Sequence, residues 1–144
     1  MSTPALLCDT GALIDYLVTE APDHAAFREA IDSARARYVP GLVLAEVDYF
    51  LRDERTAMAA LMRDLSRGAF TYAAPTLGTL ARAMEIDRQH VHLGLGLVDA
   101  SIIALAEELG VHRIATRDVR HFTAVTLRRG KRFELVVQPT RPER

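Results

Sequence analysis

The feature that most constrains the fold of this chain is a repeated alternation of short apolar runs with longer stretches of helical periodicity. The apolar runs have the length of buried strands, and most are followed by a segment with apolar residues every three to four positions. Strands that alternate with amphipathic helices form a parallel sheet, because each crossover must return the chain to the same end of the sheet. The sequence therefore predicts an α/β fold with a central parallel sheet.

The expected elements can be placed along the chain by these patterns. We expect strands over residues 5–8, 37–39, 70–72, 112–116 and 133–137. We expect helices over residues 12–17, 56–65, 76–90 and 98–109, with two more that begin at Pro22 and after Pro40-Gly41. The segment 93–97 contains two glycines and is expected to be a flexible connector. No boundary interrupts this pattern, so we expect one domain over residues 1–144.

The composition is that of an ordinary globular protein, with 49% hydrophobic and 26% charged residues. The single cysteine, Cys8, excludes a disulfide within the monomer and fits a reducing compartment. No apolar stretch approaches the roughly 20 residues that span a bilayer, and no secretory signal is visible. We therefore expect a soluble, cytoplasmic protein without membrane contacts.

Basic residues are concentrated at the end of the chain. Residues 113–144 hold nine Arg and Lys against three acids, a net charge of +6, whereas residues 1–112 carry a net charge of −7. This region, including a basic tail over about 138–144, is either a phosphate-contacting surface or a solvated arginine-rich segment. Charge alone does not separate these two interpretations.

Two carboxylates are expected at the carboxyl edge of the sheet. Asp9 directly follows the first predicted strand, and Asp118 comes two residues after the strand that ends at Thr116. In open α/β sheets, ligands bind beyond the carboxyl ends of the strands. Each acid, taken alone, is better explained as a cap of the helix or turn that follows it.

Two further acids, Glu46 and Asp99, lie near the starts of predicted helices between apolar neighbours. Alone, Glu46 could be a surface residue and Asp99 an acid favoured by the helix dipole. An acid beside the inward face of a helix is costly unless it is paired, and the sequence offers no evident basic partner. A divalent cation would compensate the charge, and it would suit phosphodiester hydrolysis. We interpret the other candidate acids as surface residues: Asp15, Asp48, Asp53, Asp64 and Asp87.

The ordered set of short motifs around these acids resembles the PIN-domain nucleases. Length and motif order are similar to the VapC-type toxins of bacterial type II toxin–antitoxin pairs, over Leu6 to about Val137. The motifs that carry the resemblance are Asp9-Thr10, Glu46 within Leu-Ala-Glu-Val, Asp99 within Val-Asp-Ala-Ser, and Thr116-Arg117-Asp118.

The resemblance implies a three-layer α/β/α domain and an endoribonuclease that cleaves tRNA or ribosomal RNA. It implies that Asp9, Glu46, Asp99 and Asp118 are catalytic and bind Mg²⁺ or Mn²⁺. It also implies a cognate VapB-type antitoxin and a homodimer. By position, Thr10, Thr116 and Ser101 would support the acids. We further expect RNA phosphate contacts from four arginines: Arg117, Arg120, Arg128 and Arg129.

Other functional classes fit the sequence less well. Gly11 replaces the second aspartate of a haloacid-dehalogenase-type phosphatase, no lysine is placed for a receiver domain, and no P-loop or dinucleotide fingerprint is present. A zinc site built from His90, His92, His112 and His121 is disfavoured because these residues lack a tight ligand spacing. A PIN-like module that binds RNA or a partner without cutting, and an RNA-processing nuclease that is not a toxin, remain as alternatives.

Overall fold

The computed structural model describes residues 3–140 and contains a five-stranded sheet in which every pairing is parallel. The sheet order is β3-β2-β1-β4-β5. The predicted α/β fold with a central parallel sheet is therefore confirmed. The strands are β1 (Leu6–Cys8), β2 (Arg37–Pro40), β3 (Thr71–Ala73), β4 (Arg113–Ala115) and β5 (Glu134–Leu135).

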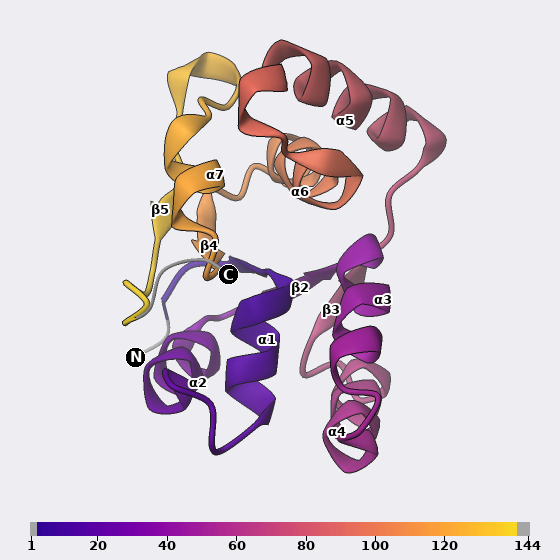
Figure 1. Cartoon of the computed structure of the whole chain (residues 1–144), viewed down its shortest axis with the longest axis vertical. Helices are drawn as coiled ribbons and strands as arrows, with labels where there is room; N and C mark the ends of the chain where they lie inside the picture. Colours follow the sequence, from indigo (N-terminus) through magenta and orange to yellow (C-terminus); the bar gives the residue numbers. More distant parts are fainter. Residues whose placement is uncertain (1–2, 141–144) are drawn as a thin grey trace.

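Helices cover both faces of the sheet, which gives the three-layer arrangement visible in Figure 1. Below the strands in that view lie α1 (Thr10–Leu17), α2 (His24–Ser33), α3 (Gly41–Phe50) and α4 (Arg55–Ser66). Above them lie α5 (Leu77–Gln89) and α6 (Gly96–Leu109), while the short α7 (Val119–Ala124) packs beside β5. None of the helices within residues 3–140 has the length and apolar character needed to cross a membrane.

The core is centred on β1 and α6. All three residues of β1 are buried, and the run from Ala100 to Ala106 in α6 is buried on every side. This helix packs against both α5 and the sheet, which explains why its sequence is almost uniformly apolar. A charged residue in its first turn, Asp99, is therefore held by a rigid, fully packed element.

Local signals explain where the helices of this layer begin and end. Thr76 and Thr79 form a reciprocal capping box at the start of α5. Helix α6 ends at Gly110, which takes the left-handed conformation (φ 68°) that favours glycine. These two signals fix the lengths of the paired helices.

The segment 93–97 differs from the expected flexible connector. A short 3₁₀ turn, η1 (Val91–Leu93), includes its first residue, and the side chains of Leu93 and Leu95 are buried. Helix α6 begins at Gly96, two residues before the predicted start at residue 98. The backbone N–H of Gly96, at this helix start, donates to Asp87 Oδ1 at 3.1 Å. Asp87 is therefore a structural acceptor rather than a free surface acid.

The end of the chain also differs from the prediction. The last strand is limited to Glu134–Leu135 instead of residues 133–137. Before it, a second 3₁₀ turn, η2 (Arg128–Gly130), carries arginines on the surface. Of the predicted basic tail over about 138–144, residues 141–144 lie outside the described residues.

The sheet topology creates a crevice beyond the carboxyl ends of its two central strands. Leu7 pairs with Ile114 and Cys8 with Ala115, so β1 and β4 end at the same level. The chain continues from β1 to β2 on one side, whereas β4 lies on the other side. Such a reversal of strand order is where α/β sheets bind ligands.

Candidate metal centre

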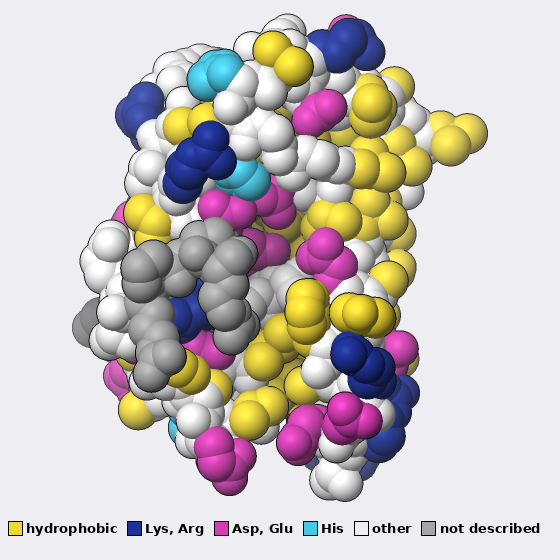
Figure 2. All heavy atoms as spheres, in the orientation of Figure 1, with side chains coloured by type: hydrophobic (Ala, Val, Ile, Leu, Met, Phe, Trp, Pro, Cys, Tyr) yellow, Lys and Arg dark blue, Asp and Glu magenta, His cyan; other side chains and the backbone are white. Residues whose placement is uncertain are grey.

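Four separate elements bring the predicted carboxylates to one cleft at this edge of the sheet. Asp9 follows β1 and Asp118 follows β4, while Glu46 projects from α3 and Asp99 from the first turn of α6. The cleft has a volume of about 900 Å³, near the upper end of the range for ligand sites. Figure 2 shows acidic side chains gathered in the middle of this face of the molecule.

Threonine hydroxyl groups hold three of the four acids. Thr116 Oγ1 donates to Asp9 Oδ2 at 2.7 Å and accepts the backbone N–H of Asp118 at 2.9 Å. Thr10 Oγ1 donates to Glu46 Oε1 at 2.6 Å. Thr10 and Thr116 thus contact three of the four acids, and their supporting role stays a prediction.

The side chain of Ser101, which was predicted to support the acids, is hydrogen-bonded to the backbone instead. Its side chain is completely buried, and Ser101 Oγ donates to the carbonyl oxygen of Val98 at 2.6 Å. The hydroxyl group is therefore bonded within its own helix, one turn back, rather than to an acid.

Two of the acids also cap helices. Asp9 is the N-cap of α1 and accepts the N–H of Thr10 at 2.7 Å, and Asp118 is the N-cap of α7 and accepts the N–H of His121 at 3.1 Å. Capping and membership of the acidic cluster are therefore not alternatives, because one carboxylate oxygen caps while the other contacts a second partner, Thr116 for Asp9 and His121 for Asp118.

Burial and the charges of neighbouring acids raise the pKa of two members of the cluster, Asp9 and Asp99. Burial raises the pKa of Asp9 to about 6, with further contributions from the charges of Asp118 and Glu46. Burial and the charge of Asp9 raise the pKa of Asp99 to about 9. A bound cation would relieve this repulsion, and carboxylate oxygens are the donors that hard divalent cations prefer.

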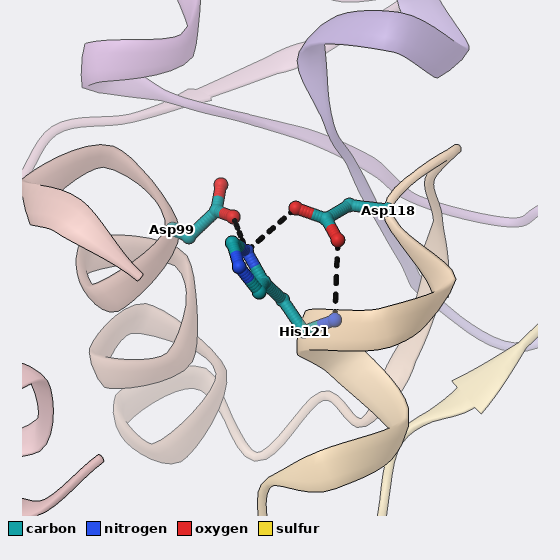
Figure 3. A group of neighbouring side chains, drawn as sticks. All are labelled: Asp99, Asp118 and His121. Atoms are coloured by element: carbon teal, nitrogen blue, oxygen red, sulfur yellow. Dashed lines mark hydrogen bonds and ion pairs between the residues drawn. The ribbon is translucent and has the colours of Figure 1, made fainter. Parts of the chain in front are cut away.

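His121 joins the acidic cluster, which the sequence analysis did not predict. Figure 3 shows its ring pointing between Asp99 and Asp118, with Nδ1 2.6 Å from one Oδ2 of each. Within residues 3–140 these three side chains form the one group of ligating atoms close enough to hold a metal ion together. The sequence signal was the spacing of Asp118 and His121, three residues apart at the start of a helix.

Arg117 lines the cleft, but its guanidinium group is bonded to two acids inside the protein, and its predicted phosphate contact stays a prediction. Its Nη1 lies 2.6 Å from Asp15 Oδ2 and 2.7 Å from Asp23 Oδ2, and all three side chains are buried. Burial alone would raise the pKa of Asp23, but the hydrogen bonds from Arg117 and Thr140 lower it below its ordinary value. Asp15 is consequently a buried partner rather than the surface acid that was predicted.

The other three arginines are exposed, and none of them lines the cleft. Arg120 is exposed and its Nη1 donates to the carbonyl oxygen of Leu93 at 3.3 Å. Arg128 and Arg129 lie on η2, and neither lines the cleft. Arg128 instead hydrogen-bonds through its backbone N–H to Glu107. Their proposed contacts with RNA therefore stay a prediction.

The remaining acids that were taken as surface residues fit that interpretation. Asp48 is half exposed and pairs with Arg55 at 2.8 Å, away from the cleft lining. Asp64 pairs with Arg67 at 2.8 Å, and Asp53 is exposed. These three acids are not candidates for the metal centre.

Comparison with known proteins places this site in a family context. The family model described as the PIN domain matches residues 6–126. Ribonuclease VapC26 of Mycobacterium tuberculosis (strain ATCC 25618 / H37Rv) is 35% identical over 134 residues, which cover 91% of this chain and 99% of that protein. The crystal structure of M. tuberculosis VapC20, described as a sarcin-ricin loop cleaving toxin, matches with a TM-score of 0.71 and 20% identity. That match covers 80% of this chain and 91% of the VapC20 chain, and it supports the fold alone.

Proposed function

The chain belongs to the PIN-domain family, in its VapC-type branch, and on that premise we propose that it is a metal-dependent endoribonuclease and the toxin of a type II toxin–antitoxin pair. The observation that carries the proposal is the convergence of Asp9, Glu46, Asp99 and Asp118 from four elements on one open cleft. Four buried or half-buried carboxylates at the edge of a parallel sheet are costly, and phosphodiester hydrolysis uses such a cluster.

The donor set of the cleft fits a divalent cation. Asp99 and Asp118, which have ligating atoms within 4.8 Å of each other, would hold Mg²⁺ or Mn²⁺. Asp9 would join them directly or through water, and Glu46 would complete the ligand set or orient the attacking water. The raised pKa values of Asp9 and Asp99 support this proposal. They indicate that no positive charge in the cleft compensates the buried carboxylates, and a divalent cation would supply that charge. When bound, the ion would supply charge stabilisation for the phosphoryl oxygens and lower the pKa of a coordinated water.

The residues of the chain itself would orient the reacting groups. The hydroxyl group of Thr116 bonds both to the carboxylate of Asp9 and to the backbone N–H of Asp118. It therefore links the ends of β1 and β4, which carry these two acids. Thr10 holds Glu46 in the cleft through its hydrogen bond to Oε1, where the other carboxylate oxygen would accept a proton from water. Hydrogen bonds of this kind preorganise a site before the substrate binds.

The relatives guide the proposals for substrate and partners. The chain is similar to ribonuclease VapC26 over nearly its whole length. We therefore propose that its substrate is RNA, in the class of tRNA or ribosomal RNA. A VapB-type antitoxin that blocks the cleft and a homodimer of this chain belong to the same proposal. A small gene beside this one, encoding the antitoxin, would favour the toxin role over RNA processing.

Purified protein provides the direct test of the activity. Bulk tRNA and ribosomal RNA are incubated with the wild type, with Asp99→Asn and with Asp48→Asn, in Mg²⁺ and in EDTA. Wild type and Asp48→Asn should produce discrete fragments in Mg²⁺ alone, because Asp48 lies outside the cleft. Asp99→Asn should lose at least about 100-fold of the rate, as expected when transition-state charge stabilisation is removed. Cleavage by Asp99→Asn at the wild-type rate would contradict the proposal, and no cleavage by any protein would favour a non-cutting module.

A further inference from the structure

The ring of His121 is held by contacts on both of its nitrogens. Nδ1 lies 2.6 Å from Asp99 Oδ2 and 2.6 Å from Asp118 Oδ2, and Nε2 lies 3.0 Å from the carbonyl oxygen of Leu93. Leu93 is itself buried. The backbone N–H of His121 donates to the other oxygen of Asp118 at 3.1 Å (Figure 3). The imidazole therefore has a fixed orientation in the acidic cluster.

These contacts determine which ring nitrogen can serve as a ligand. A carbonyl oxygen only accepts hydrogen bonds, so the contact with Leu93 at 3.0 Å places a hydrogen on Nε2. The contact of Nε2 with the donor Arg120 Nη1, which would need the opposite tautomer, is longer, at 3.5 Å. In the neutral ring, Nδ1 then carries a lone pair aimed between two carboxylate oxygens. Three such atoms can converge only around a shared positive charge, which is either a proton or a metal ion.

The arrangement around His121 is that of a metal-bound histidine. Histidines that bind metals donate their second ring N–H to a carboxylate or a backbone carbonyl, which orients the ring and fixes the tautomer. The carbonyl oxygen of Leu93 fills this role here. Donor atoms around a first-row ion at about 2.1 Å are about 3 Å apart, so the ring and the carboxylates need to separate only slightly.

We propose that His121 Nδ1 is a nitrogen ligand, beside Asp99 and Asp118, for a first-row transition-metal ion, and that it makes the centre favour Mn²⁺ and Co²⁺ over Mg²⁺. The inference rests on the proposed function, because it concerns the ion of the same cleft. Mg²⁺ demands oxygen ligands and gains little from an imidazole, whereas affinity for sites that contain nitrogen rises from Mn²⁺ to Co²⁺. One imidazole among carboxylates therefore changes the choice of metal without removing the oxygen donors.

Metal binding to the full chain, without RNA, tests this inference. Calorimetry gives the Kd for Mg²⁺, Mn²⁺ and Co²⁺ in the wild type, in His121→Asn and in the control His90→Asn. The asparagine at position 121 replaces the ring nitrogen with an amide oxygen. His90 lies outside the cleft, where its Nδ1 contacts the carbonyl oxygen of Ile86. His121→Asn should weaken Co²⁺ binding by about 10-fold or more and leave Mg²⁺ binding within about threefold, while His90→Asn should change neither.

A spectroscopic measurement on the wild type keeps the inference testable if His121→Asn fails to fold. Pulsed electron paramagnetic resonance of bound Mn²⁺ should show coupling to an imidazole nitrogen in the wild type and in His90→Asn. Absence of that coupling in the wild type, or an unchanged ratio of Co²⁺ to Mg²⁺ affinity in folded His121→Asn, would overturn the inference. RNA cleavage is measured separately, so a protein that selects metals but does not cut RNA would contradict only the proposed function.

Discussion

Replacement of Arg117 by methionine should destabilise the protein strongly, because Arg117 neutralises two buried carboxylates. Its Nη1 lies 2.6 Å from Asp15 Oδ2 and 2.7 Å from Asp23 Oδ2, and the side chains of all three are at most 9% exposed. Asp23 also accepts the backbone N–H of Thr140 at 3.0 Å, so the triad joins the end of the described chain to α1. Methionine keeps the apolar stem but leaves both acids without their cation.

The magnitude follows from the burial of the triad. Breaking a buried ion pair costs about 3–5 kcal/mol, because the charge left behind is desolvated and uncompensated. At about 3 °C per kcal/mol for a chain of this size, the melting temperature should fall by about 9–15 °C. The matched control is Arg55→Met, which removes the exposed pair with Asp48 and should cost less than about 1 kcal/mol.

Urea unfolding followed by circular dichroism measures both variants under the same conditions. Adding Asp15→Asn and Asp23→Asn to Arg117→Met should recover part of the lost stability, since the uncompensated charges are then gone. A loss in Arg117→Met no larger than that of Arg55→Met would refute the reasoning. It would mean that water or protonation already compensates the two acids, and that Arg117 is not required to neutralise them.

Three further predictions concern the cleft and the core. In EDTA, Asp9 keeps a proton in the folded protein up to about pH 6 but loses it near pH 3.8 when unfolded. The folded protein therefore loses about 3 kcal/mol of its free energy of unfolding as the pH rises from about 4 to above 6, because the buried carboxyl group must then ionise. Urea unfolding should accordingly show Asp9→Asn gaining stability over wild type between pH 4 and pH 7, and an equal difference at both values would contradict this. Burial raises the pKa of Cys8 to about 12, so a thiol reagent should label it only after unfolding, and rapid labelling of native protein would disprove its burial. Mn²⁺ at about 100 times its Kd should stabilise the wild type by about 2.7 kcal/mol, and a thermal melt showing the same gain in Asp99→Asn would mean that the ion binds elsewhere.

The positions of three of the four acids could be predicted from the sequence because local rules determine them. A strand that ends at Cys8 must deliver Asp9 to the carboxyl edge, and the same holds for Asp118 after β4. Asp99 lies in the first turn of α6, and the apolar sequence that follows it shows that this helix is buried. Each of these inferences uses only neighbouring residues and the general geometry of parallel sheets.

The partners of Arg117 and His121 could not be predicted in this way. Arg117 pairs with Asp15 across 102 positions, and no periodicity of α1 shows that Asp15 faces inward to meet it. His121 reaches Asp99 across 22 positions, and only the folded position of α7 brings them together. Long-range polar pairs depend on tertiary packing, which sequence patterns describe poorly.

The central claim, that the acidic cluster cuts RNA, is tested most directly by inducing the chain in a bacterial host and sequencing new 5′ ends in total RNA. Wild type, Asp99→Asn and the surface control Asp48→Asn are induced in parallel, with equal amounts of soluble protein confirmed. The account predicts growth arrest and the same discrete new ends with wild type and Asp48→Asn, and neither effect with Asp99→Asn. New ends of equal abundance with Asp99→Asn, or none with wild type, would contradict it.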